Sequence, residues 1–142
     1  MNRITADDSG NIAYQLVGEV PMRTHGGANA VPAPGWTGEY DWMGYIPFAE
    51  LPWAKNPERH FVVSANNRVV PAGYKYYIHL TAVPYRAWRI EELLQSKERF
   101  DIQDFMKIQG DRYCRPAATL VQMLTDIKPT AETQQALEML HS

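Results

Sequence analysis

The pair Asn66-Asn67 combines a residue type and a setting that suit acyl-transfer chemistry. The two asparagines follow the apolar run at residues 61–65 (FVVSA), which predicts a short buried strand. An asparagine held at a strand end can offer a fixed amide N–H to an oxygen that gains negative charge in a transition state. The same pair is also typical of a simple turn, so spacing alone leaves both interpretations open.

The other reactive side chains form no recognisable constellation. The histidines show no i,i+4 pair and have no cysteine nearby, which disfavours a metal site, and we predict no cofactor. Cys114 is the single cysteine, so it can form no internal disulfide; a small core residue is the favoured interpretation and a catalytic role the minor one. We expect the two acidic pairs, Asp7-Asp8 and Glu91-Glu92, to face solvent. The histidines are His25, His60, His79 and His141.

Two halves of different composition must position these residues. Residues 1–84 are rich in glycine, proline and aromatic residues and predict strands and loops. Residues 85–142 are rich in Leu, Glu, Gln, Lys and Ala and predict helices. We therefore predict an α+β chain that forms a single partial domain over residues 1–142, with a strand and loop part at 1–84 and a helical part at 85–142.

The first half is expected to open with a β-hairpin. Turn residues at 8–11 separate segments 3–7 and 12–18, the second of which alternates apolar and polar residues. Pro21 is expected to end that strand because proline cannot donate to a strand ladder. Residues 21–60 then predict a long loop punctuated by proline and glycine.

The second half predicts about four helices. The first begins just after Pro84, and the second is capped by Asp101 and stopped by Gly110. A third is expected at residues 116–127. Thr130 is expected to cap a last helix that ends at Leu140.

Charge and hydropathy exclude some partners. The 142 residues carry 14 Lys+Arg and 16 Asp+Glu, a net charge of −2 with no basic run, so we predict no nucleic-acid partner. The apolar stretches are too short to cross a membrane, and the first residues show no apolar signal region. We therefore expect no membrane partner and no export signal within this chain.

The long segment 21–60 is unusually aromatic. Disordered linkers lack such residues, so we expect its rings to pack over the edge of a core. Trp and Tyr faces also suit sugars and cations, which keeps a binding platform open as the alternative. The residues are Trp36, Tyr40, Trp42, Tyr45, Phe48 and Trp53.

Several motifs, in order along nearly the whole chain, resemble the penicillin acylase (penicillin amidase) family. They are ADDSGNI at 6–12, PAPGWTGEYDW at 32–42, GYIPFAELP at 44–52, Asn56-Pro57, VSANNR at 63–68 and PYRAWRIEELL at 84–94. The resemblance is clearest over residues 2–125. Any one motif would be weak, but several in register form a specific signal.

The resemblance implies an N-terminal nucleophile hydrolase with a four-layer αββα core, of which this chain would be a partial fold from the large chain. In that family a precursor cleaves itself before a Ser, whose hydroxyl attacks an amide carbonyl while its own α-amine serves as base. By register, Asn66 matches the asparagine that donates to the oxyanion. Arg86 matches an arginine that organises the site.

The same resemblance indicates what this chain would lack. None of Ser9, Ser64, Ser96 and Ser142 lies in the nucleophile context, so the nucleophile and the small chain are expected before Met1. Many members carry an acidic residue before a Tyr-Pro pair, whereas here the stretch at 69–75 is VVPAGYK, which argues against the family's calcium site in this chain. The missing part of the same precursor and a small-molecule amide are the expected partners.

The leading hypothesis is a fragment of an amidohydrolase, inactive alone, that acts on a linear amide such as an N-acyl amine, an N-acyl homoserine lactone or a β-lactam side chain. The whole protein would be periplasmic or secreted. Partial sheets predict exposed edge strands, apolar surface and a tendency to associate. The alternatives are a non-catalytic module that binds a sugar or protein through the aromatic segment, and a truncated reading frame without a selected function.

Overall fold

The structure is a computed structural model that describes residues 1–24, 32–78, 83–124 and 128–141. It is an α+β chain, as expected, with strands in the first part and helices in the second. Two compact units divide it, residues 1–87 and residues 88–142. Each is described by itself below.

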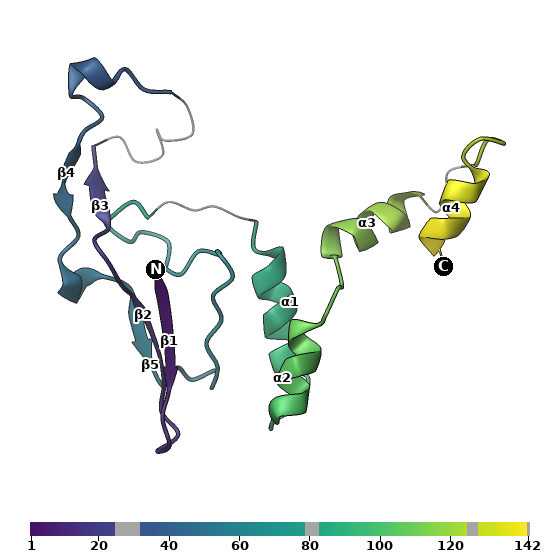
Figure 1. Ribbon diagram of the computed structural model, residues 1–142, viewed down its shortest axis with the longest axis horizontal. Helices are drawn as coiled ribbons and strands as arrows, with labels where there is room; N and C mark the ends of the chain where they lie inside the picture. The colour runs from purple at the N-terminus through teal and green to yellow at the C-terminus, as the bar shows by residue number, and fades with distance from the viewer. Residues whose placement is uncertain (25–31, 79–82, 125–127, 142) are drawn as a thin grey trace. The chain divides into compact units, whose positions relative to one another are not determined.

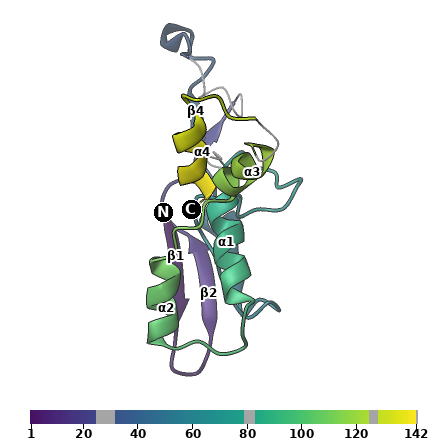
Figure 2. The same ribbon diagram turned by 90° about the vertical axis from the view of Figure 1, so that its right-hand side faces the viewer.

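The predicted N-terminal hairpin is confirmed. Strand β1 (Asn2–Ala6) pairs antiparallel with β2 (Ile12–Leu16), and Figures 1 and 2 show the two side by side. The turn is closed by the Asp7 carboxylate, which accepts the backbone N–H of Asn11 at 2.8 Å and its side-chain amide at 2.8 Å. These hydrogen bonds lower the pKa of Asp7. The turn is therefore ordered by Asp7, the residue just ahead of the predicted turn residues 8–11.

The segment expected to be a long loop, residues 21–60, instead contains three strands of a second, longer hairpin and includes its return arm. Strand β3 (Pro21–Arg23) pairs with β4 (Trp42–Tyr45), and β5 (Trp53–Lys55) pairs with β2. Backbone bonds from Ile46 to Val20 and from Leu16 to Pro52 continue the contact between the arms. Figure 1 shows β4 and β5 running back along β3 and β2.

The prediction that Pro21 ends the second strand is wrong, because β2 ends at Leu16 and Pro21 itself lies in a strand. Pro21 begins β3, and the pairing with β4 shifts register between Pro21 and Arg23. A proline at the first position of a strand next to an irregularity removes little from the ladder. Two short 3₁₀ turns, Gly35–Thr37 and Phe48–Glu50, flank β4.

A small core joins the paired arms to residues of the segment 62–78. Its buried members come from β2 and from the segment around the second 3₁₀ turn, and Leu51 is the most buried at 2% exposure. Tyr14 points its hydroxyl to the Asn2 side-chain oxygen at 2.7 Å, which satisfies the polar end of an otherwise apolar contact. The buried cluster is Tyr14, Leu16, Ile46 and Leu51, with Val20, Met22, Ala54, Val62, Val69, Tyr76 and Ile78 packed against it.

The expectation that the aromatic rings pack over a core is wrong for all six, Tyr40 included. Trp36 is 89% exposed, and Trp42, Tyr45, Phe48 and Trp53 are exposed as well. Strand pairing, rather than burial of these rings, orders this part of the chain. Arg23 lies over the Trp42 ring at 5.4 Å, and Trp42 meets Tyr45 edge-on.

Residues 61–65 do not form the predicted strand. Val63 is buried and Val62 packs on the core, so the apolar pattern was correct about burial. The backbone of this run pairs with none of the described strands. Instead the Arg59 Nε donates to the Phe61 carbonyl at 3.2 Å, and the Ala65 N–H donates to the Asn67 side-chain oxygen at 2.9 Å.

Four helices follow, as predicted: α1 (Tyr85–Leu94), α2 (Ile102–Gln109), α3 (Arg115–Leu124) and α4 (Gln134–His141). Asp101 caps α2 in a reciprocal capping box with Asp104, and Gly110 ends it, both as expected. The predicted end of the third helix at 125–127 lies outside the described residues. Among the described ranges, none of these helices is both long and apolar enough to cross a bilayer.

The Thr130 cap is wrong. Helix α4 begins at Gln134, four residues later, after a turn in which the Thr133 hydroxyl accepts the Thr130 backbone N–H at 2.9 Å. The Thr130 carbonyl instead accepts the N–H of Gln134 at 3.0 Å. The threonine pair thus forms a turn ahead of the helix.

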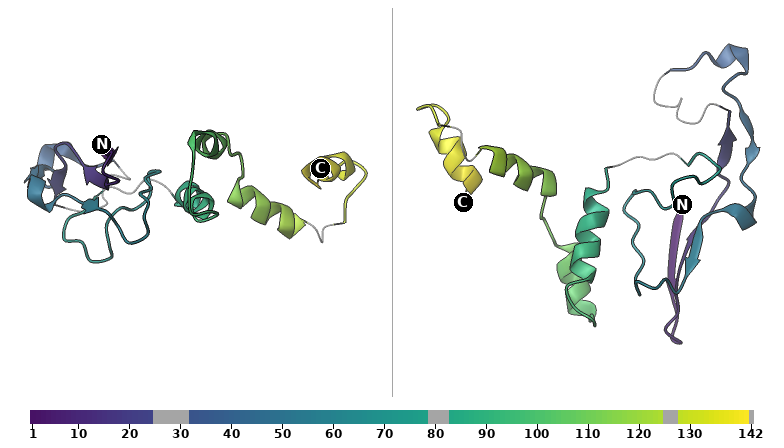
Figure 3. Two further views of the ribbon diagram at one scale, coloured as in Figure 1. Left: turned by 90° about the horizontal axis from the view of Figure 1, so that it is seen from below. Right: turned by 180° about the vertical axis from the view of Figure 1, so that it is seen from behind.

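Ion pairs organise the second unit. Figure 3, left, shows α1 and α2 end-on and side by side. From α1, Arg89 pairs with Asp111 at 2.7 Å and with Glu92 at 2.9 Å, and Glu92 also receives Arg115 of α3 at 2.7 Å. The Arg89 guanidinium lies over the Tyr113 ring at 4.6 Å.

This network predicts a pH dependence of stability. The Arg89 hydrogen bond lowers the pKa of Asp111 below its ordinary value of 3.8. A carboxylate with a lowered folded-state pKa stabilises the fold above its unfolded pKa, and that contribution is lost as pH falls through the folded pKa. We expect unfolding free energy to fall below about pH 4, where unfolded aspartates protonate. Asp111→Asn should flatten that decline in urea titrations at several pH values, whereas an unchanged slope would contradict it.

Exposed apolar surface and an exposed edge strand, both expected of a partial fold, are present. All of β1 is exposed and lies at the edge of its sheet. On the helices, Ile102, Met123 and Met139 are each at least 70% exposed. Association of the chain in solution stays a prediction.

Candidate functional site

The two neighbouring asparagines differ in their hydrogen bonds and in their backbone conformation. The Asn67 side-chain oxygen accepts the backbone N–H of Ala65 at 2.9 Å, and its amide nitrogen donates to the Arg68 carbonyl at 3.3 Å. Asn67 therefore closes the local turn. Asn66 is exposed and has a left-handed backbone with φ of 61°, which asparagine tolerates better than most residues. Of the two sequence interpretations, the turn applies to Asn67, and the donor role of Asn66 stays a prediction.

Arg86 reaches Asn66 across 20 residues of sequence. It is the second residue of α1, and its Nη2 donates to the Asn66 Oδ1 at 2.6 Å. The structure thus brings together the two residues that the sequence singled out. Each is next to a buried anchor: Val63 precedes Asn66 by three residues at 6% exposure, and Ala87 follows Arg86 at 2% exposure.

The hydrogen bond has a direction that matters for chemistry. An asparagine amide carries one acceptor atom, Oδ1, and one donor group, Nδ2. Because Arg86 engages Oδ1, the amide is oriented with Nδ2 as its donor on the opposite side. A bond from a guanidinium is also charge-assisted and polarises the amide. This arrangement suits donation to an oxygen that develops negative charge.

The stretch after the pair is held by a cationic side chain. The Arg68 Nε donates to the Val70 carbonyl at 3.0 Å, and its Nη2 donates to the Pro71 carbonyl at 2.9 Å. Two backbone oxygens that could have faced a cation therefore already accept from a guanidinium.

The donor set does not fit the family's calcium ion. Ca²⁺ takes six to eight oxygen ligands and favours carboxylates. Residues 66–75 contain no carboxylate, and the described residues as a whole contain no group of three His, Cys, Asp or Glu side chains able to hold a metal. This stretch carries Arg68 and Lys75 instead.

We therefore expect the stability of the chain not to depend on calcium. The melting temperature should be the same in about 1 mM calcium and in excess chelator. A ligand that does not bind the native state cannot stabilise it. Differential scanning fluorimetry with magnesium as the matched control measures this. A rise with calcium that magnesium does not reproduce would contradict the expectation.

The remaining sequence candidates lie apart from this pair or outside the described residues. Cys114 is exposed, so the core role predicted for it is wrong; it lies just ahead of α3. His60 is exposed in a turn, and His25 and His79 lie outside the described residues. Glu92 and Asp7 serve ion pairing and turn formation, as described above.

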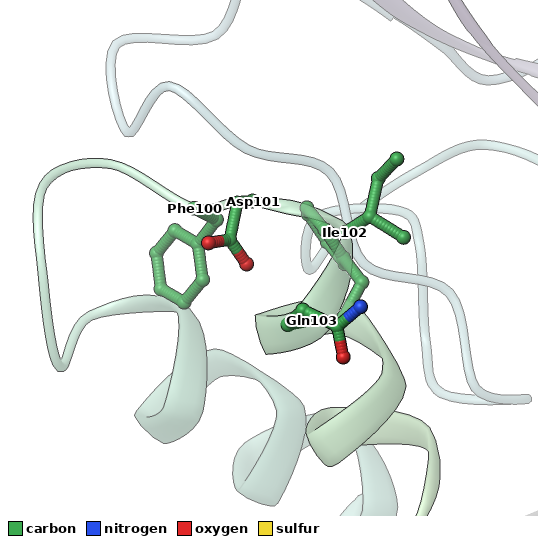
Figure 4. Close-up of a pocket in the computed structure, with 5 residues that line it drawn as sticks. Phe100, Asp101, Ile102 and Gln103 are labelled. Atoms are coloured by element: carbon green, nitrogen blue, oxygen red, sulfur yellow. The ribbon is translucent and has the colours of Figure 1, made fainter.

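A shallow hollow in the second unit is unsuited to catalysis. Figure 4 shows it at the start of α2, lined by Phe100, Asp101, Ile102, Gln103 and Phe105. The Asp101 carboxylate is engaged in the helix cap, accepting the Asp104 N–H at 2.9 Å. The hollow therefore contains no pair of groups for acid–base or nucleophilic chemistry.

Glu50 is the residue that sequence reasoning missed. Its carboxylate pairs with Lys75 and accepts the Tyr76 hydroxyl at 2.7 Å, and its backbone oxygen accepts the Tyr74 hydroxyl at 2.6 Å. The sequence signal was present, since Glu50 lies inside the motif at 44–52. Its partners are 24 to 26 residues away, which no local pattern reveals.

Comparison with known proteins agrees with the resemblance. The family model described as penicillin amidase matches residues 1–142. An acyl-homoserine lactone acylase QuiP from Pseudomonas syringae is 33% identical over 99% of this chain and 17% of its own length. A penicillin acylase 2 proenzyme from Pseudomonas sp. is 35% identical over 78% of this chain and 14% of its own length.

A solved structure shows the same fold. The thermostable penicillin G acylase from Alcaligenes faecalis superposes with a TM-score of 0.62 at 26% identity, covering 97% of this chain and 26% of that chain. The chain thus spans about a sixth of the length of the curated relatives named above. The penicillin amidase family model covers every described element, and the chain belongs to that family.

Proposed function

We propose that this chain is part of an amidohydrolase that cleaves a linear amide, and that Asn66 and Arg86 belong to its active site. The relatives are named for penicillin and for acyl-homoserine lactones, both of which carry an acyl group on an amide nitrogen. An N-acyl amine, an acyl homoserine lactone or a β-lactam side chain is the proposed substrate class. The remainder of the same precursor is the proposed partner, and the periplasm or the exterior the proposed location.

One observation carries the proposal: the Arg86 Nη2 to Asn66 Oδ1 hydrogen bond at 2.6 Å. It joins residues from two motifs that are far apart in sequence. It engages the acceptor atom of the amide, Oδ1, which supports a role for the donor group, Nδ2, at an oxyanion. A turn asparagine would need no such partner, and the turn here is made by Asn67.

The division of labour follows from these contacts. A nucleophilic hydroxyl, supplied from outside residues 1–142, attacks the amide carbonyl and turns its oxygen into an oxyanion. Asn66 Nδ2 donates to that oxyanion. Arg86 touches Asn66 and is a positioning residue, since it holds the amide and polarises it. A donor fixed in advance stabilises the transition state without paying for reorganisation during the reaction.

The proposal states what the isolated chain should do. Purified residues 1–142 should release no amine from phenylacetyl or long-chain acyl amides above the buffer rate, because a donor without its nucleophile stabilises no intermediate. The assay is fluorescent detection of the released amine, with a complete penicillin G acylase as positive control. Turnover of about 1 per second or faster, the range of ordinary enzymes, would refute the division of labour.

A second candidate rests on a separate observation, the exposed aromatic side chains of the return arm. Trp36, Trp42 and Trp53 are 89%, 56% and 66% exposed. Exposed indole faces suit sugar rings, which favours a binding module. Saturable glycan binding that is lost in Trp42→Ala and kept in the control Met43→Ala would support this candidate. If the chain binds no glycan, the amidohydrolase proposal is the one that remains.

A further inference from the structure

A second cluster of polar contacts lies just after the residues that carry Asn66. Three consecutive side chains converge on Glu50. Tyr74 donates to its backbone oxygen at 2.6 Å, Tyr76 donates to its carboxylate at 2.7 Å, and Lys75 pairs with the same carboxylate. We call Glu50, Tyr74, Lys75 and Tyr76 the Glu50 cluster.

The cluster is reinforced by packing among its own members. Tyr74 and Tyr76 meet edge-on with ring centroids 5.8 Å apart, and the Lys75 ammonium lies 4.7 Å from the Tyr76 ring centroid. Tyr76 also packs on the buried core, and Glu50 immediately precedes Leu51, the most buried residue of that core. The contacts therefore join a surface segment to the best-packed point of the first unit.

The segment that carries Asn66 needs such a fixed point. Between β5, which ends at Lys55, and α1, which begins at Tyr85, the described residues contain no strand and no helix. Besides the turn that Asn67 closes and the Arg86 contact, the position of Asn66 depends on what anchors the chain on either side of it. Val62 and Val63 lie upstream, and Val69 and the Glu50 cluster lie downstream.

We propose that Glu50 is a positioning residue for Asn66, acting through Tyr74, Lys75 and Tyr76 to fix the segment that presents the oxyanion amide to Arg86. The inference rests on the proposed function for its purpose, since it says how the Asn66 amide is held in place. The geometric claim itself, that the Glu50 cluster sets the Asn66–Arg86 contact, can be tested without any catalytic turnover.

The charges are consistent with a contact that persists near neutral pH. Hydrogen bonds from Lys75 and then Tyr76 lower the pKa of Glu50, and the Glu50 hydrogen bond raises the pKa of Lys75. Both partners are therefore charged across the whole physiological range. The pair lies partly in solvent, so its role is geometric rather than a large source of stability.

The test measures the Asn66 amide directly in the full 142-residue chain. Nitrogen-15 spectra report the Asn66 Nδ2 pair, the Arg86 Nε signal and the backbone amides of β2. We expect Tyr76→Phe and Lys75→Met, which each remove one contact to Glu50 and keep the side-chain stem, to shift and broaden the Asn66 and Arg86 signals together. The β2 amides should stay in place. Glu50→Gln should do the same, and Glu58→Gln, a change at an exposed glutamate, should do nothing.

Two results would overturn the proposal. One is that the Asn66 and Arg86 signals match wild type in every variant while signals at 74–76 move, because the cluster would then be local. The other is that β2 signals move as much as Asn66 even in Tyr76→Phe, because the cluster would then serve the whole fold. Failure of the proposed function would be seen elsewhere, as an unchanged hydrolysis rate when the Asn66 amide is removed.

Discussion

Replacing Asn66 with glycine in the complete enzyme that contains this segment should lower kcat by about 10²–10³, the usual effect of losing one oxyanion donor. The substrate KM should change little, because the donor is engaged mainly in the transition state. Steady-state hydrolysis of a chromogenic amide measures both constants. A kcat within a few-fold of wild type would contradict the role of Asn66.

The choice of glycine separates chemistry from backbone strain. Asn66 has φ of 61°, a conformation that glycine adopts freely and alanine does not. Asn66→Gly therefore removes the amide without straining the turn, whereas Asn66→Ala does both. Asn66→Asp keeps the side-chain shape but exchanges the donor for an acceptor, so it should be at least as slow as Asn66→Gly.

Substitution of Arg86 tests the same Asn66–Arg86 hydrogen bond from its other partner. Arg86→Met should lower kcat by less than Asn66→Gly, because the amide remains but is no longer held. Combined with Asn66→Gly, the Arg86 substitution should add little further loss, since residues that act as a unit are not additive. Fully additive effects in this double-mutant cycle would show that Arg86 acts independently of Asn66.

Leu51→Ala should produce the largest loss of stability. Leu51 is 2% exposed and packs with Tyr14, Leu16 and Ile46. Truncating a buried leucine removes transfer free energy and leaves a cavity, which costs about 2–5 kcal/mol. That is a large share of the about 5–15 kcal/mol that holds a typical domain together. Urea denaturation of the 142-residue chain, followed by tryptophan fluorescence, measures the difference.

Phe48→Ala is the matched control, three residues away. Phe48 is 69% exposed, and a surface substitution of this kind changes stability by about 0.5 kcal/mol or less. Both variants truncate an apolar side chain of one short segment to alanine, and the exposed Phe48 loses the larger group. Equal losses at both positions would show that the core is not where the structure places it.

Local chemistry explains which elements were predictable. The hairpin turn at Asp7 to Asn11 and the capping box of α2 use side chains that bond within four residues, so sequence alone reveals them. The same holds for α1, whose start follows Pro84. The return arm of the long hairpin was missed because its pairing joins residues such as Tyr14 and Ala54, which no local pattern connects.

The failed predictions share a physical cause. Val63 is buried and Val62 packs on the core, as their apolarity predicts, but burial of side chains does not by itself produce strand pairing. Trp36 and Trp53 are apolar enough to be buried, yet both side chains are exposed in the described part of the chain. Burial depends on what else folds nearby, and the relatives are about six times longer than this chain.

The candidate site was predictable only through the resemblance. Spacing alone left Asn66 as either a turn residue or a donor, and Arg86 had no independent sequence signal. The motifs at 63–68 and 84–94, which resemble the family, identified both residues as candidates. The structure adds the contact between them and the orientation of the amide, and it reveals Glu50, whose partners are too distant in sequence to be inferred.

The central claim is that these residues are part of an amide-cleaving enzyme. The most direct measurement isolates the native protein from its source with an antibody against residues 1–142 and assays the bound material for hydrolysis of N-acyl amides. We predict that hydrolysis is retained on the antibody, that it is absent from the recombinant 142-residue chain, and that intact mass shows more polypeptide than this chain. Native material that contains only this chain and hydrolyses no amide would contradict the account.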